Sequence, residues 1–257
     1  MRTNGWISFL VVGVAVVGCS EDVGSSAIRT KGMYANYETL SEGDGKTTVT
    51  AELRVGGDDG TYVVFEDPDR LVASADDDEE VLDGFDDGKK YRTTFDTDAG
   101  GTVVNISFER GEDENAPDSS VKLPEPFTLD LADFDEGAEI ARGEAVAITW
   151  DPGASGEIDW EVSGDCIWTE DDKTKDDGSF TIPASAFRVH DLDEGESCEV
   201  TITLDRTNSG RVDRAFEEGG EFEATQRRRI TFTSTPAPGE VPDDDDDGAG
   251  GAGGSSN

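Results

Sequence analysis

The sequence is poor in basic side chains and has a single histidine. It contains 21 Lys and Arg against 60 Asp and Glu in 257 residues, which gives a formal net charge of −39. Phosphate binding needs patches of Lys and Arg, so this balance excludes a nucleic-acid-binding protein. One histidine argues against the commonest hydrolase and zinc sites. Hydrophobic residues still make up 34% of the chain, so it can build cores beneath an anionic surface.

Long hydrophobic runs are scarce as well. The one apolar stretch covers residues 7–17, and its 11 residues are too few to cross a bilayer core of about 30 Å. This excludes a polytopic membrane protein. Because Arg2 supplies a short basic region before the apolar stretch, residues 1–18 predict a secretory signal peptide.

The end of this segment carries a more specific motif. Val16-Val17-Gly18-Cys19 places two aliphatic residues and a small one before a cysteine, and it resembles the lipobox of bacterial lipoproteins. The resemblance implies cleavage between Gly18 and Cys19, a diacylglyceryl group on the Cys19 sulfur and an acyl chain such as palmitate on its amino group. Two or more acyl chains hold a protein stably in a membrane. Ser20 favours the outer membrane under the sorting rule of such lipoproteins, and the sequence leaves open the cell-surface or periplasmic face.

Cysteine usage fits an oxidising compartment. If Cys19 is lipidated, Cys166 and Cys198 remain, and an even remainder in an exported chain predicts one disulfide. Asp165 and Glu199 stand next to these cysteines and oppose a thiolate, which argues against a redox pair.

Alternation of apolar and polar residues predicts an all-β protein with two tandem β-sandwich domains. The first domain is expected at residues 27–117 and the second at 122–236, after a lipidated cysteine and polar tether at 19–26. Strands are predicted near residues 48–55, 61–65, 90–95, 102–108, 127–131, 146–150, 158–162, 180–183, 198–204 and 228–232. Residues 112–120 are predicted to be a loop or boundary between the domains, and Trp168 is expected to lie beside an acidic loop. The Asp/Gly-rich residues 237–257 predict a disordered acidic tail.

A second family resemblance lies in the second domain. Ile148-Thr149-Trp150-Asp151-Pro152, followed by Ile158-Asp159-Trp160, resembles the region from strand B to strand C in fibronectin-III and immunoglobulin-like sandwiches. Cys166 and Cys198 both follow Trp160, unlike the cysteines of antibody domains. The resemblance therefore implies the fold class alone.

The candidate sites are few, and no catalytic or metal-ligating residue is assigned. Acidic runs near residues 76–80 and 83–88 are interpreted as solvated loops, with a calcium site as the alternative to having no cofactor. Arg227-Arg228-Arg229 either docks an anionic partner or pairs with neighbouring carboxylates at a strand edge. Trp150 and Trp160 are expected in the core and Trp168 at the surface. His190 is expected to be a surface residue.

Together these observations predict a lipid-anchored, non-catalytic envelope protein of the outer membrane. Its expected role is surface binding, adhesion or structure. Its expected partners are the membrane, through the N-terminal anchor, and an unidentified envelope or extracellular molecule. The alternatives are a periplasmic envelope-assembly factor and an enzyme acting on polysaccharide. One fold can serve many functions, so the predicted fold does not decide between these alternatives.

Overall fold

The computed structural model describes residues 22–135, 137–153, 156–189 and 197–236. These residues form strands and three short 3-10 helices, at Ser25–Ala27, Thr30–Gly32 and Ala184–Phe187. The predicted all-β class is therefore confirmed. No helix in the described part of the chain is long and apolar enough to span a membrane. The signal peptide at 1–18, Gly18, Cys19, His190 and the tail at 237–257 lie outside the described residues.

One large sheet runs through the whole molecule. Its main path contains, in order, β1 (Val23–Gly24), β4 (Thr61–Val64), β3 (Thr47–Val55), β2 (Tyr34–Ser41), β18 (Gly220–Thr235), β17 (Cys198–Ser209), β14 (Glu157–Gly164) and β15 (Ile167–Lys175). Three further strands join it from the side: β7 (Asp83–Phe85), β8 (Lys90–Phe95) and β12 (Glu139–Ala141).

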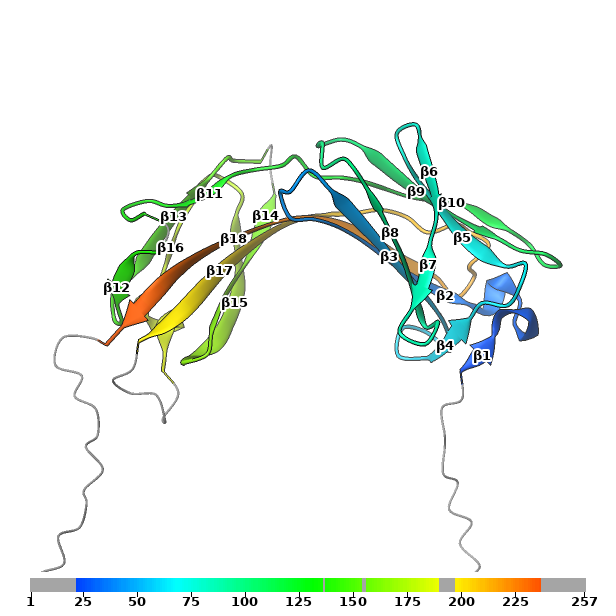
Figure 1. Cartoon of the computed structure of the whole chain (residues 1–257), viewed down its shortest axis with the longest axis horizontal. Helices are drawn as coiled ribbons and strands as arrows, with labels where there is room; N and C mark the ends of the chain where they lie inside the picture. The colour runs from blue at the N-terminus through cyan, green and yellow to red at the C-terminus, as the bar shows by residue number, and fades with distance from the viewer. Residues whose placement is uncertain (1–21, 136, 154–155, 190–196, 237–257) are drawn as a thin grey trace, which may run out of the picture.

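Two smaller sheets pack against one face of this shared sheet. The first contains β10 (Ala116–Lys122), β9 (Val103–Glu109), β5 (Arg70–Ala75) and β6 (Asp78–Val81). The second contains β11 (Leu129–Leu131), β13 (Val146–Trp150) and β16 (Ser179–Ile182). Figure 1 shows the result as an arch, with the shared sheet on the inner side and the smaller sheets on the outer side.

The second sandwich has the strand order of an immunoglobulin-type domain. Strands β11, β13 and β16 correspond to A, B and E, and they face β18, β17, β14 and β15, which correspond to G, F, C and C′. Trp160 lies buried on the C strand, as in that fold. The stretch predicted to run from strand B to strand C therefore does so. In the first sandwich, β8, β3, β2 and β18 face β10, β9, β5 and β6.

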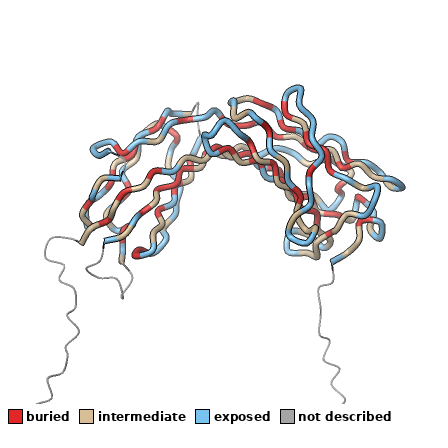
Figure 2. The backbone as a smooth tube through the Cα atoms, viewed as in Figure 1, coloured by how far each residue is buried: buried red, intermediate tan, exposed pale blue. Residues whose placement is uncertain are grey.

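Two hydrophobic clusters lie between the sheets. Buried residues alternate with exposed ones along most strands (Figure 2), so half of each strand can carry charge while the other half packs. The clusters do not divide at the expected boundary near residue 120. Phe216, Phe222 and Ala224, from the range 122–236, pack in the first cluster.

Three local expectations need correction. Residues 116–122 form β10 rather than a loop. They occupy a sheet edge, where Pro117 is tolerated, and a register shift between Ala116 and Ser119 breaks the alternation. Residues 167–175 form β15 rather than an acidic loop. It is an edge strand with little burial and so lacks an apolar signal. The tether is shorter than residues 19–26, because Val23 and Gly24 pair with β4.

Candidate functional site: a polar groove on the inner face of the arch

The face of the shared sheet that looks away from both smaller sheets carries a groove. A hollow of about 620 Å³ crosses β15, β14, β17 and β18, and a second hollow of about 280 Å³ adjoins it toward β2. The two hollows share Asp159, Asp205 and Arg227, so they form one surface, which we call the inner groove. Because the shared sheet is the inner layer of the arch (Figure 1), the face with this groove is the concave one.

Strand register explains which side chains line this groove. On β17, Val200, Ile202 and Leu204 face the core, so the residues between them face the groove. Pairing then aligns groove residues into rows across the strands. One row contains Lys173, Asp159, Asp205 and Arg227, and the next contains Asp171, Glu161, Thr203 and Arg229.

Charges in the first row pair with their cross-strand neighbours. Lys173 Nζ lies 2.9 Å from Asp159 Oδ1, and Arg227 Nε donates to Asp205 Oδ1 at 2.7 Å. The hydrogen bond to Asp159 raises the pKa of Lys173, and the hydrogen bond to Asp205 raises the pKa of Arg227. Both cations therefore stay protonated throughout the physiological range.

Hydroxyl groups and further carboxylates, among them Glu161, Asp171 and Glu223, line the rest of the groove. Thr207 and Thr225 lie opposite each other, with their Oγ1 atoms 2.9 Å apart. Ser163 lies opposite Thr201 on β14 and β17. The groove thus offers donors, acceptors and charges of both signs on an open β-surface. This chemistry suits recognition of a polar partner.

The three consecutive arginines have three different environments. Arg227 pairs with Asp205, and Arg229 pairs with Glu42 in the turn between β2 and β3. Arg228 points to the other face, where its Nε donates to the carbonyl oxygen of Phe127 at 2.8 Å. Two of the three arginines thus pair with carboxylates, as one of the two interpretations has it, but Arg228 does not, and β18 lies between β2 and β17 rather than at the edge of the sheet.

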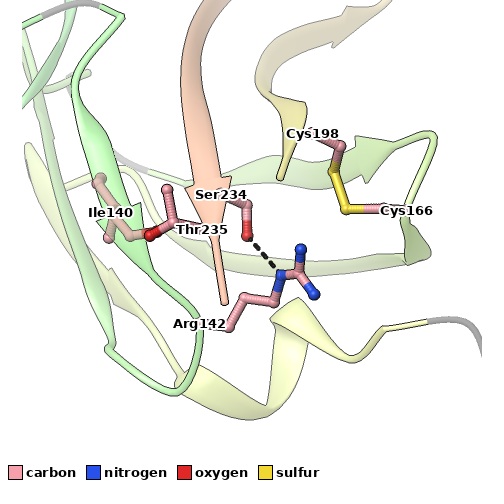
Figure 3. Close-up of a disulfide and its surroundings, with 6 residues drawn as sticks. All are labelled: Ile140, Arg142, Cys166, Cys198, Ser234 and Thr235. Carbon is pink, nitrogen blue, oxygen red and sulfur yellow. Dashed lines mark hydrogen bonds between the residues drawn. A yellow bond between two sulfur atoms is a disulfide. The ribbon is translucent and has the colours of Figure 1, made fainter. Parts of the chain in front are cut away.

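The predicted disulfide between Cys166 and Cys198 is present. It joins the turn after β14 to the first residue of β17 (Figure 3). Nearby, β12 pairs in parallel with the end of β18, and Arg142 Nε donates to Ser234 Oγ at 3.3 Å (Figure 3). The disulfide thus cross-links β17 to the turn after β14, at the end of the sheet that lies away from the first sandwich.

The acidic runs, expected to be solvated loops, are only partly turns: Asp78–Val81 form β6 and Asp83–Phe85 form β7. Asp76 lies in the turn from β5 to β6, and Asp86 and Asp87 lie in the turn from β7 to β8, all three with positive φ. Asp tolerates this conformation better than most residues. Within the ranges that the structure describes, no group of three His, Cys, Asp or Glu side chains is placed to hold a metal ion.

The tryptophans lie where the sequence predicts. Trp150 and Trp160 are buried in the second core, and Trp168 is 56% exposed. Sequence reasoning missed the groove itself. The signal was present in β17, where Thr201, Thr203 and Asp205 form the polar half of an alternation whose apolar half was recognised. Their partners on β14, β15 and β18 follow from register, which one sequence does not reveal.

Comparison with known proteins gives little further guidance. No protein-family model and no curated protein matches the chain. Among solved structures, it is similar to a two-domain fibronectin type-III segment of chicken tenascin, at 11% identity and a TM-score of 0.24, over 78% of this chain and 97% of that one. A three-domain immunoglobulin segment of titin (I67–I69, an E-to-A mutated variant) gives 10% identity and a TM-score of 0.23, over 80% of this chain and 64% of that one.

The adhesin InvE of Yersinia pseudotuberculosis gives 13% identity and a TM-score of 0.20, over 79% of this chain and 59% of that one. The chain thus spans less than two thirds of the titin and InvE chains. Because all three TM-scores are low, the fold class rests on the strand order described above.

Proposed function

We propose that this protein is a lipid-anchored, non-catalytic binding protein of the bacterial cell envelope. The anchor would be Cys19, cleaved from Gly18 and acylated, in the outer membrane. The inner groove would be the binding surface. The observation that supports binding most directly is the groove itself, a polar surface that continues across strands of both sandwiches.

An open sheet face favours binding over catalysis. Enzymes generally close their reacting groups away from water. Here Lys173, Asp159, Asp205 and Arg227 lie on an accessible surface and are engaged with one another. Paired charges on such a surface give specificity and orientation to a partner.

The short connection to Cys19 supports the anchored arrangement. The first strand, β1, begins at Val23, four positions after Cys19. Four residues reach at most about 14 Å. Arg110 holds this start in place by donating to the carbonyl oxygens of Ser25 at 2.7 Å and Ile28 at 3.1 Å. A lipidated Cys19 would therefore hold β1, at the N-terminal end of the first sandwich, close to the bilayer.

Protease treatment of intact source cells tests the anchor and the side of the membrane. We expect wild-type protein to stay with the cells and Cys19→Ala to appear in the medium. Loss of cell-bound protein on shaving would place it at the surface. Protection until the outer membrane is breached would place it in the periplasm and favour the envelope-assembly alternative. Release of wild type like the variant would overturn the anchor.

Filling the groove tests the binding surface. Ser163→Tyr with Thr201→Tyr puts two β-compatible aromatic side chains into the inner groove. Ser107→Tyr, on β9 in the outer sheet, is the matched control. We expect purified wild type and the control to be retained by isolated envelopes or extracellular material of the source cells, and the groove variant to be lost. Equal retention of all three would show that the groove is not the contact.

A further inference from the structure

The shared sheet has a narrow connection between its two halves. Strand β2 pairs with β18 from Gly220 to Gln226, and β14 pairs with β17 from Val200 to Asp205. Among the described strands of this sheet, only β17 and β18 run from one sandwich into the other. We call residues 204–206 of β17 and 226–228 of β18 the waist. Each row of the waist has a third strand, but that strand changes sides: β2 flanks β18 at Gln226, and β14 flanks β17 at Asp205 and Leu204. Because only β17 and β18 join the two halves of the sheet, the waist is where the arch would bend.

A buried ionic cluster lies beside the waist on the outer side of the sheet. Arg206 donates from Nε to Asp176 Oδ2 at 2.6 Å and from Nη2 to Asp176 Oδ1 at 2.7 Å. Asp176 also accepts hydrogen bonds from Trp150 Nε1 at 2.8 Å and from the backbone of Gly153 at 3.1 Å. A two-pronged Arg–carboxylate pair of this kind is both strong and directional.

The same arginine holds the segment that connects the two smaller sheets. Its Nη1 donates to the carbonyl oxygen of Glu125 at 2.8 Å, between β10 and β11. The ring of Phe127 lies between two cations, with Cζ of Arg206 4.6 Å and Cζ of Arg228 5.3 Å from its centroid. Arg228 also donates to the carbonyl oxygen of Phe127. The connecting segment is therefore fixed to both strands of the waist.

Strand alternation puts this cluster directly behind the groove. Arg206 stands between Asp205 and Thr207, and both of these line the inner groove. Arg228 likewise stands between Arg227 and Arg229, which line the groove as well. Any bend or twist at the waist would thus change the spacing of groove residues on the opposite face.

We propose that Arg206 and Arg228, acting on Phe127 and Asp176, form a clasp that fixes the angle between the two sandwiches and so the shape of the inner groove. The clasp residues are positioning residues. The proposal concerns the angle of the arch and holds whether or not the groove binds the envelope partner proposed above.

Distance measurement between the two sandwiches tests the clasp. Spin labels on an unnatural side chain at Val103 of β9 and Thr181 of β16 report this distance in the full chain carrying Cys19→Ala, which leaves the disulfide intact. The test variant is Arg206→Lys with Arg228→Lys, which keeps both charges but removes the guanidinium forks. The control is Arg70→Lys, which changes an exposed Arg–Glu109 pair in the first sandwich.

We expect one narrow distance distribution for wild type and the control, and a clearly broadened one for the double variant while it is still folded. A narrow distribution in the folded double variant would overturn the proposal, even if its melting temperature fell. So would a broad distribution in wild type. If the double variant does not fold, Asp176→Asn carries the same labels and the same two outcomes.

Discussion

At the scale of single residues, Asp176 is the side chain on which several parts of the second sandwich converge. It contacts a strand of the shared sheet through Arg206 and a strand of the small sheet through Trp150. Burial raises the pKa of Asp176, but the hydrogen bonds from Arg206, Trp150 and Gly153 outweigh it and hold the pKa below its usual value. The ionised form is therefore the one that the fold stabilises.

This linkage predicts how Asp176→Asn responds to pH. Removing one partner of a buried ion pair costs about 3–5 kcal/mol of unfolding free energy at neutral pH. Because the pKa is lower in the folded state, the contribution is present above the unfolded value of about 3.9 and is lost as pH falls through the folded pKa. We expect the stability gap between wild type and variant, measured by urea unfolding, to narrow in acid. A gap that stays constant from neutral pH down to the acid end would contradict this account.

At the scale of elements, the sequence predicts strands in which large apolar residues alternate with polar ones, and it misses the others. It misses β2 and β5, whose buried positions are largely small or polar residues. Residues 48–55, 90–95 and 146–150 alternate strongly, and each is a strand within a residue of its expected bounds. Strand β6 has four exposed residues, and β15 is mostly exposed. Neither has a hydrophobic signal, because edge strands are held by backbone pairing more than by packing.

The sequence pattern underestimates the lengths of β17 and β18, the two strands that both sandwiches share. The apolar alternation predicts 198–204 and 228–232, but β17 runs to Ser209 and β18 runs from Gly220 to Thr235. Their extensions contain Arg206 and Gln226, polar residues that are buried at the waist. Such residues look like loop positions until their partners are known. The groove and the clasp therefore depended on long-range pairing that local pattern does not contain.

At the scale of the whole molecule, charge is the dominant property. The formal net charge is −39, and the ion pairs in the described chain engage only part of the 60 carboxylates. Like charges on the surface repel one another and weaken the compact state. Screening by salt shortens the reach of this repulsion, to about 3 Å at 1 M ionic strength.

We therefore expect the melting temperature to rise between about 0.05 M and 1 M NaCl. Potassium chloride at the same ionic strength should give the same rise, because screening does not depend on which monovalent cation is present. A flat or falling melting temperature would show that surface repulsion does not limit the stability of this fold.

The route of β18 has a consequence for how the newly synthesised chain folds. Phe222 and Ala224, near the C-terminal end of the described chain, complete the core that begins with Met33 and Ala35. The N-terminal sandwich consequently cannot close until residues 220–226 have been synthesised, because this part of its sheet follows most of the second sandwich in the chain. Contacts this distant in sequence form slowly. The first sandwich would therefore stay open during most of synthesis, and both halves would finish folding together once residue 226 is available.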